Sequence, residues 1–310
     1  MAARDRIILS MLDASGQGIE IGPGYNPMFP KSKGYNVATV DHATGDEIRR
    51  KYAEMGVDTS LVGEVDYVWR GEPLHEIVAR PGSYDFVFAS HVIEHIPDIL
   101  AFIHSCEKLL KETGVVVLVV PDKRYCFDVF RPVATTGDLL QANLEGRRRH
   151  PPGKIFDHTA YVAWKYRGLT WTKWGKGPVE FMHPDLETAR RKMEEASRSD
   201  AYEDAHGWQF VPSSFRLILN DLNSLGLTSM KEVAFHDSHG GTYEFFISFG
   251  RSGRGCPVDR LTLCNRILRE AAAGHENLRP SLFSFCLRHA RMFAYACKQR
   301  LLASRRPPRS

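Results

Sequence analysis

The segment at residues 18–24, Gly-Ile-Glu-Ile-Gly-Pro-Gly, constrains the fold of this chain more than any other. Its Ile-Glu-Ile centre between glycines predicts a short buried strand that ends in a tight turn. Glycines at such a turn let the backbone approach a ligand without an intervening Cβ. A dinucleotide-binding turn needs the pattern Gly-x-Gly-x-x-Gly, and Pro27 occupies the third glycine position here. The turn therefore favours a ligand without phosphates over a nicotinamide dinucleotide.

Strand and helix patterns alternate after this turn, which is typical of a parallel sheet with right-handed crossovers. Further strands are expected at residues 35–40, 64–68, 84–90, 114–121, 231–236 and 242–249. Helices are expected at residues 46–55, 97–111 and 212–225. The last two strands flank the turn His239-Gly240-Gly241, which indicates a hairpin. We therefore expect an α/β fold with a doubly wound, mostly parallel seven-stranded Rossmann-like sheet that ends in an antiparallel hairpin.

The pattern loosens between residues 122 and 206, where three tryptophans and one charged helix, at 186–197, occur. A structureless loop of that length is uncommon in a compact protein. We expect instead a helical cap, inserted at 122–206 into a domain that spans residues 1–250. Residues 251–310 then form a helical C-terminal tail, with helices at 258–273 and 281–302.

The tail is basic, with 13 Lys and Arg against 3 Asp and Glu, whereas the rest of the chain has 28 against 34. A nucleic-acid partner is not expected for such a mildly acidic body. The second tail helix can pack on the body, pair with a second subunit or lie on a membrane surface. The apolar run near the N-terminus, at residues 7–9, is too short for the core of a signal peptide. Six cysteines without a Cys-x-x-Cys pair fit a reducing compartment. We expect a cytoplasmic protein, with peripheral contact at the inner membrane as an alternative.

Asp41 ends the second predicted strand, about twenty residues after the glycine turn, where a carboxylate can accept hydrogen bonds from a ribose diol. Capping of the next segment is the alternative role. Two further motifs follow in order: the run at 84–98, which includes Ala-Ser-His-Val-Ile-Glu-His-Ile-Pro-Asp, and Leu-Leu-Lys-Glu-Thr-Gly at 109–114. The ordered set resembles the class I S-adenosylmethionine (SAM)-dependent methyltransferases, over about residues 16–125 and more loosely to Phe249.

The resemblance implies SAM as cofactor and a set of binding residues, which are Glu20, Gly22, Gly24, Asp41, Glu72, Ser90 and His91. In such enzymes the glycines pass under the cofactor and the carboxylate after the second strand binds the ribose. By the same resemblance, Glu20 lies near the methionine amino group, and the backbone at Ser90 and His91 lies beside the methionine moiety. Adenine recognition falls to Glu72 or to the backbone at Gly71, and here the sequence departs from the family pattern.

Candidate catalytic groups are histidines near carboxylates, since a poorly acidic acceptor hydroxyl needs a base and His is the usual choice. The candidates are His95, His158 and His206, drawn from Glu94-His95, Asp157-His158 and Asp204-x-His206. An ordinary structural role is the alternative for each of them. No metal site is expected, because these clusters lack the spacing of metal ligands along the chain.

Two basic residues, Lys123 and Arg124, follow the fifth strand and either clamp an anionic substrate or begin a solvated helix. Three tryptophans of the cap either stack on an acceptor or form the cap's own core: Trp164, Trp171 and Trp174.

The leading hypothesis is a SAM-dependent methyltransferase that acts on a hydroxyl or carboxyl of a small molecule or glycan precursor. The alternatives are a SAM-binding scaffold without turnover and a Rossmann oxidoreductase, which Pro27 disfavours.

Overall fold

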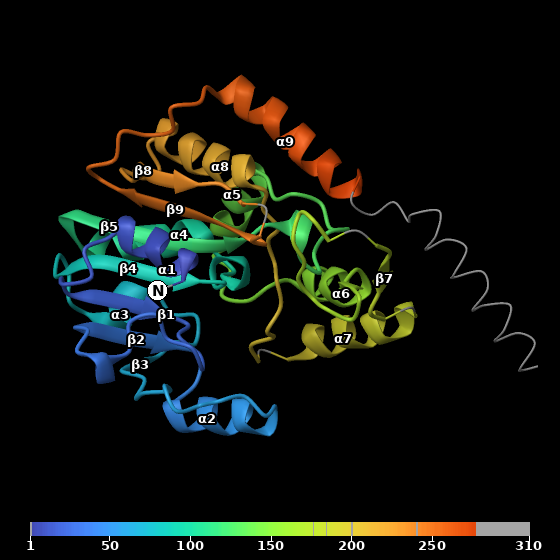
Figure 1. Ribbon diagram of the computed structural model, residues 1–310, viewed down its shortest axis with the longest axis horizontal. Coiled ribbons are helices and arrows are strands. Elements are labelled where there is room, and N and C mark those ends of the chain that lie inside the picture. The colour runs from blue at the N-terminus through green and yellow to red at the C-terminus, as the bar shows by residue number, and fades with distance from the viewer. Residues whose placement is uncertain (1, 176, 184, 200, 240, 277–310) are drawn as a thin grey trace, which may run out of the picture.

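The computed structural model describes residues 2–175, 177–183, 185–199, 201–239 and 241–276. Its centre is a seven-stranded sheet in the order β3-β2-β1-β4-β5-β9-β8 (Figure 1). The strands are β1 (Gly18–Ile21), β2 (Val37–Asp41), β3 (Tyr67–Val68), β4 (Tyr84–Ser90), β5 (Leu110–Pro121), β8 (Lys231–His236) and β9 (Glu244–Gly250). The first five are parallel, and β9 is antiparallel to both β5 and β8. The predicted fold class is thus confirmed, including the terminal hairpin.

Both faces of the sheet are covered, because alternate residues of a strand point to opposite sides. In β5, Leu118 belongs to one apolar cluster, and its neighbours Val117 and Val119 belong to the other. Helix α1 (Ala3–Ser10) covers the second cluster through Ile8. The first cluster is covered by α3 (Leu74–Val78), α4 (Ile99–Leu109), α5 (Thr136–Leu144) and α8 (Pro212–Ser224). Burial on both faces explains the continuous apolar run that predicted β5.

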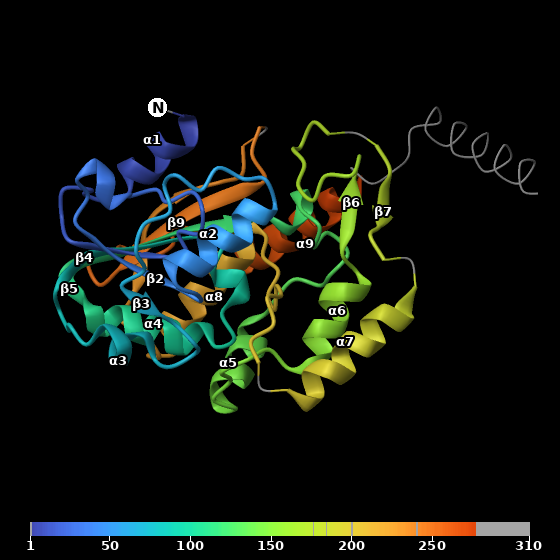
Figure 2. The same cartoon turned by 90° about the horizontal axis from the view of Figure 1, so that it is seen from below.

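The stretch between β5 and α8 divides between the core and an outlying layer. Helices α6 (Pro152–Ala160) and α7 (Leu186–Arg198) pack on each other, beside the two-stranded sheet of β6 (Ala163–Lys165) and β7 (Val179–Phe181) (Figures 1 and 2). Helix α5, which the sequence analysis did not predict, buries Leu139 and Ala142 in the main core instead. Short 3-10 helices lie at Lys31–Lys33, Ile93–His95 and Lys123–Tyr125.

Helix α2 (Gly45–Glu54) begins with a reciprocal cap at the carboxyl edge of the sheet. Thr44 Oγ1 accepts the backbone N–H of Glu47, and the Glu47 carboxylate accepts the N–H of Thr44 at 2.8 Å. This cap fixes the helix that carries Lys51 and Tyr52 to the pocket described below.

The chain after the hairpin returns along the outside of α8. Helix α9 (Arg260–Glu276) buries Leu263, and Glu270 accepts hydrogen bonds from the N–H and the hydroxyl of Ser213 at the start of α8. The first predicted tail helix therefore exists and packs on the body. The second, at 281–302, lies outside the described residues. Within the described ranges, no helix is both long and apolar enough to cross a bilayer.

Candidate active site

A pocket opens at the carboxyl ends of β1, β2, β3 and β4, on both sides of the point where the strand order reverses. This is where open α/β sheets bind their ligands. Its far side is closed by residues from two later segments, at 148–149 and 202–204. The lining residues are Ile21, Gly22, Gly24, Asp41, His42, Lys51, Tyr52, Trp69, Arg70, Gly71, His91, Val92, His95, Ile96, Pro97, Arg148, Arg149, Tyr202 and Asp204. Four predicted cofactor residues and one predicted catalytic residue therefore meet in one pocket.

The turn after β1 requires glycine at two positions. Gly22 has a φ of +64° and Gly24 one of +52°, in the left-handed region that L side chains rarely adopt. A Cβ on Gly22 would also lie 2.6 Å from Cγ2 of Val92, which follows β4. The glycine thus lets the turn after β1 and the loop after β4 approach closely at the floor of the pocket.

Asp41, the last residue of β2, is buried and lines the same pocket. Its Oδ2 accepts the N–H of Gly24 at 3.1 Å, and its Oδ1 accepts the N–H of His42 at 2.7 Å. The carboxylate is therefore fixed against the glycine turn, in the place from which a carboxylate binds a nucleoside diol.

The end of β4 is held by contacts with α1 and β9. His91 adopts a positive φ of 54°, and its Nε2 lies 2.8 Å from Oε2 of Glu244. Arg4 donates to Oε1 of Glu244 at 2.8 Å and to the hydroxyl of Ser90 at 2.6 Å. His91 lines the pocket, whereas Ser90 does not, and the Ser90 hydroxyl accepts a hydrogen bond from Arg4.

Besides Ser90, two predicted cofactor residues do not line the pocket, Glu20 and Glu72. The Glu20 carboxylate accepts the N–H groups of Met28 and Phe29, at 2.6 and 3.0 Å, and burial raises the pKa of Glu20 to about 7. The Glu72 carboxylate turns back to accept the N–H of Arg70 at 3.0 Å. The neighbouring residues 69–71 line the pocket, and Glu72 does not. Glu20 holds the loop after the glycine turn, and its contact with a ligand stays a prediction, as does that of Glu72.

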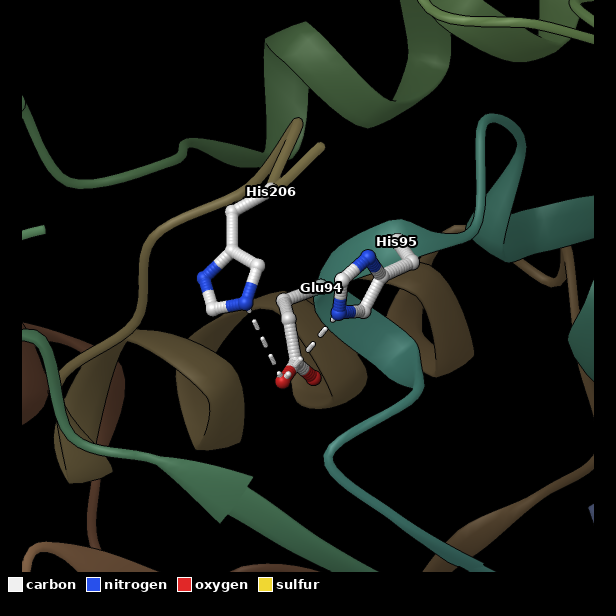
Figure 3. A group of neighbouring side chains, drawn as sticks. All are labelled: Glu94, His95 and His206. Atoms are coloured by element: carbon white, nitrogen blue, oxygen red, sulfur yellow. Dashed lines mark ion pairs between the residues drawn. The ribbon is translucent and has the colours of Figure 1, made fainter. Parts of the chain in front are cut away.

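A second group lies beside the pocket and consists of Glu94, His95 and His206; we call it the imidazole–carboxylate cluster (Figure 3). Nε2 of His206 lies 3.7 Å from Oε1 of Glu94, and Nε2 of His95 lies 3.9 Å from it. The Glu94 side chain is fully buried, and neither of its oxygens has a hydrogen-bond partner. A buried carboxylate without donors is unusual and needs a reason.

Each imidazole of the cluster is oriented by a second carboxylate behind it. Nδ1 of His206 lies 2.5 Å from Oδ2 of Asp128, and Nδ1 of His95 lies 3.0 Å from Oδ1 of Asp204. Burial alone would raise the pKa of Asp128, but the contact with His206 lowers it to about 2. The neighbouring His95 likewise lowers the pKa of Asp204. Because both Nδ1 atoms face carboxylates, both Nε2 atoms face Glu94.

The cluster is assembled by backbone contacts between distant segments. The N–H groups of Gly207 and Trp208 both donate to the carbonyl of Glu94, at 2.8 and 3.3 Å. The indole N–H of Trp208 donates to the carbonyl of Ile96 at 2.6 Å. The residues after the cap are thus fixed to the 3-10 helix that follows β4, which places His206 opposite His95.

His158, the third catalytic candidate, lies behind the cluster. Its Nδ1 accepts the backbone N–H of His206 at 3.3 Å, and burial lowers the pKa of His158 to about 3. The sequence had paired His158 with Asp157 and His206 with Asp204, and the structure pairs the carboxylates differently. Asp204 faces His95, and Asp128, which sequence reasoning missed, faces His206.

The other substrate-binding candidates have partners within the protein. Lys123 is buried and donates to the carbonyl of Val129 at 2.8 Å, and Arg124 is bound to the carboxylate of Asp122. Neither residue lines the pocket. Trp171 belongs to a small core with Tyr125, Val129 and Ala163, whereas Trp174 is 72% exposed.

A model of a family described as "Methyltransferase domain" matches residues 2–223. The chain belongs to this methyltransferase family. The motifs of its first half had indicated such a family, and the match supports this assignment over an oxidoreductase.

Curated relatives match shorter stretches of this methyltransferase. A ubiquinone biosynthesis O-methyltransferase of Xanthomonas campestris is 38% identical over 60 residues, or 19% of this chain and 25% of the relative. One from Vibrio cholerae is 30% identical over 96 residues, or 30% of this chain and 39% of the relative. The methyltransferase thus spans well under half the length of these relatives.

Solved structures overlap it more widely but loosely. A SAM-dependent methyltransferase from Methanosarcina mazei has a TM-score of 0.38 at 15% identity, covering 78% of this chain and 95% of the other. The CcbJ methyltransferase of Streptomyces caelestis has a TM-score of 0.40 at 13% identity, covering 79% and 92%. A Rhodobacter sphaeroides protein described among the Zn-dependent alcohol dehydrogenases has a TM-score of 0.43 at 14% identity, covering 81% and 91%. The family assignment rests on the family model.

The pocket residues fit SAM. Gly22 and Gly24 line the pocket with backbone alone, and Asp41 presents a fixed carboxylate beside them. Aromatic and peptide groups at Tyr52, Trp69 and Gly71 also line the pocket, as suits a nucleoside. SAM supplies an activated methyl group on a sulfonium.

Proposed function

We propose that this methyltransferase acts on a hydroxyl oxygen of a small molecule, with polyhydroxylated glycan precursors as the first class to test. The observation that carries the proposal is the position of the imidazole–carboxylate cluster. His95 belongs to both the cluster and the pocket, so the cluster adjoins the cofactor site. A hydroxyl must lose its proton before or during methylation, whereas a carboxylate acceptor is already ionised at neutral pH. An arrangement of carboxylates and imidazoles at this place suits the hydroxyl.

The two groups of residues have separate roles. The glycine turn and Asp41 bind the cofactor, and the cluster activates the acceptor oxygen. Much of the remaining rate enhancement comes from alignment of the acceptor with the methyl group, since the donor is already activated. The partly matching relatives are named O-methyltransferases, which agrees with an oxygen acceptor.

We further propose that the cap selects the acceptor. The segment at 202–206 joins α7 to the cluster and carries Asp204 and His206, so the cap and the cluster are covalently linked. Contact of the C-terminal tail with a membrane surface or with a second subunit is a separate prediction, tested by vesicle sedimentation and by sizing of the full chain.

Mass spectrometry with deuterium-labelled SAM tests the proposal. The purified chain is incubated with panels of polyols and nucleotide sugars, phenols, carboxylic acids and amines. We expect a labelled product that survives mild base, because methyl ethers resist the hydrolysis that cleaves methyl esters. A base-labile product, or transfer to amines only, would show that the acceptor is not a hydroxyl.

A further inference from the structure

We propose that Glu94, His95 and His206 form a binding site for one divalent transition-metal ion of the Zn²⁺ type. Two imidazole nitrogens and one carboxylate oxygen are a donor set that binds such ions in catalytic sites and leaves positions open for a further ligand. The three side chains offer ligand atoms that lie within 4.8 Å of one another. No other group of three or more such ligands is found among the residues that the structure describes.

The distances in the cluster fit an ion better than a hydrogen bond. Oε1 of Glu94 lies 3.7 and 3.9 Å from the two Nε2 atoms. Both separations exceed the usual N–H···O length of about 2.7–3.2 Å. Two metal–ligand bonds of about 2.1 Å span at most about 4.2 Å, so one ion can contact both partners of each pair.

The second observation is the state of Glu94 itself. Its carboxylate is fully buried, and neither oxygen has a hydrogen-bond donor. Such a group is strongly destabilising unless a donor or a cation compensates it. The two imidazoles direct Nε2 toward it without coming close enough to donate, so a cation between them satisfies all three groups at once.

The carboxylates behind the imidazoles complete the pattern of a metal centre. Histidine ligands usually donate their second ring N–H to a carboxylate or carbonyl, which fixes the tautomer and raises the basicity of the ligand atom. Asp128 takes this place behind His206, and the Asp204 carboxylate lies 3.0 Å from Nδ1 of His95. The ion is thereby surrounded by negative charge from three carboxylates, offset by Arg131, which is ion-paired with Asp128 at 2.9 Å.

The site is open toward the pocket through His95 and Asp204, which both line it. An acceptor hydroxyl in the pocket can therefore take an open coordination position. Coordination lowers the pKa of the hydroxyl, and its proton passes to solvent at the mouth of the pocket. This role rests on the proposed hydroxyl acceptor, whereas metal binding itself does not.

A Co²⁺ titration followed by visible absorption tests the site in the full-length chain after treatment with a chelator. We expect one tight Co²⁺ per chain, displaced by Zn²⁺ and not by equimolar Mg²⁺, which prefers oxygen ligands. Glu94→Gln and His206→Ala should each weaken Co²⁺ binding at least 100-fold. The matched control is the double variant His236→Gln/His239→Gln, which removes two histidines near the β8–β9 turn and should bind like wild type.

A positioning variant sharpens the result. Asp128→Asn keeps all three ligands and should weaken Co²⁺ binding about 10- to 100-fold through His206. Calorimetry with SAM on every variant shows whether the fold is intact. The proposal is wrong if folded wild type and Glu94→Gln bind Co²⁺ alike, or if only the control variant His236→Gln/His239→Gln loses Co²⁺ binding. Metal binding without hydroxyl methylation would contradict the proposed function and leave the metal site standing. Hydroxyl methylation by metal-free protein would support the proposed function and contradict the role of the metal in activating the acceptor.

Discussion

The cofactor side of the pocket and the imidazole–carboxylate cluster are built in different ways. The cofactor side comes from short segments at the ends of β1 and β2, where the glycine turn and Asp41 contact each other directly. The cluster joins residues after β4 with His206, and its supporting carboxylates are Asp204, from the same segment as His206, and Asp128, from the loop after β5. A local motif determines the first site, and long-range packing determines the second. The two sites should therefore fail separately when they are mutated.

The largest expected effect concerns the cluster. Glu94→Gln should reduce methyl transfer at least about 100-fold, which is the low end of what a positioned catalytic group supplies. SAM affinity should stay within a few fold, because Glu94 does not line the pocket. Initial rates at saturating SAM measure the first quantity and calorimetry the second. Full activity in the folded variant would remove the cluster from catalysis.

A change in the glycine turn should affect SAM binding, in contrast to the change at Glu94. Gly22→Val should weaken SAM binding more than about 100-fold, because a β-branched residue is strained at a φ of +64° and its Cβ would meet Val92. Calorimetry measures the affinity, and far-ultraviolet circular dichroism verifies the fold. Gly34→Val is the matched control, since its φ is +87° and no atom lies within 4 Å of its Cβ position. Equal SAM affinities of the two variants would contradict the close-approach argument.

A smaller loss of SAM affinity is expected when Asp41 is replaced. Asp41→Ala should weaken SAM binding about 10- to 100-fold, because hydrogen bonds to a charged group contribute roughly 1.5–3 kcal/mol each and water partly replaces them. Asp41→Asn retains one acceptor oxygen, so its SAM affinity should lie between those of wild type and Asp41→Ala. Normal SAM binding by the folded alanine variant would exclude the ribose role.

The smallest effect is expected at Glu20, and it is seen in stability. Burial raises the pKa of Glu20 from 4.5 to about 7, so the folded state holds the proton more tightly than the unfolded chain. This contribution to stability is fully present below about pH 4.5 and is lost as the pH rises to about 7. The melting temperature of wild type relative to Glu20→Gln should therefore fall across that range. If the melting temperatures of the two proteins change with pH in the same way, the raised pKa of Glu20 is contradicted.

The sequence predicted most of the sheet because its signals are local. The strands at 84–90 and 231–236 have the predicted bounds, since buried β-branched and aromatic runs are readable without tertiary context. Helix α5 was missed, because only its packing against α4 and α8 shows that Leu139 and Ala142 belong to the core.

The cluster was only partly predictable for the same reason. His95 and His206 were chosen for their chemistry, but their carboxylates were sought among chain neighbours. Asp128 lies in a loop after β5, and no local pattern links it to His206. The expectation of no metal site rested on ligand spacing along the chain, and such spacing says nothing about side chains from separate segments, such as those of the site proposed above.

The division between the two sites is tested most directly by calorimetry of SAM binding to Asp41→Ala and Glu94→Gln, measured side by side with transfer by each variant at saturating SAM. We predict that Asp41→Ala loses SAM affinity and recovers much of its transfer rate at saturation. Glu94→Gln should bind SAM like wild type and remain inactive. If Glu94→Gln instead loses SAM affinity while its saturated rate is normal, Glu94 belongs to the cofactor site and the account of two separate sites is wrong.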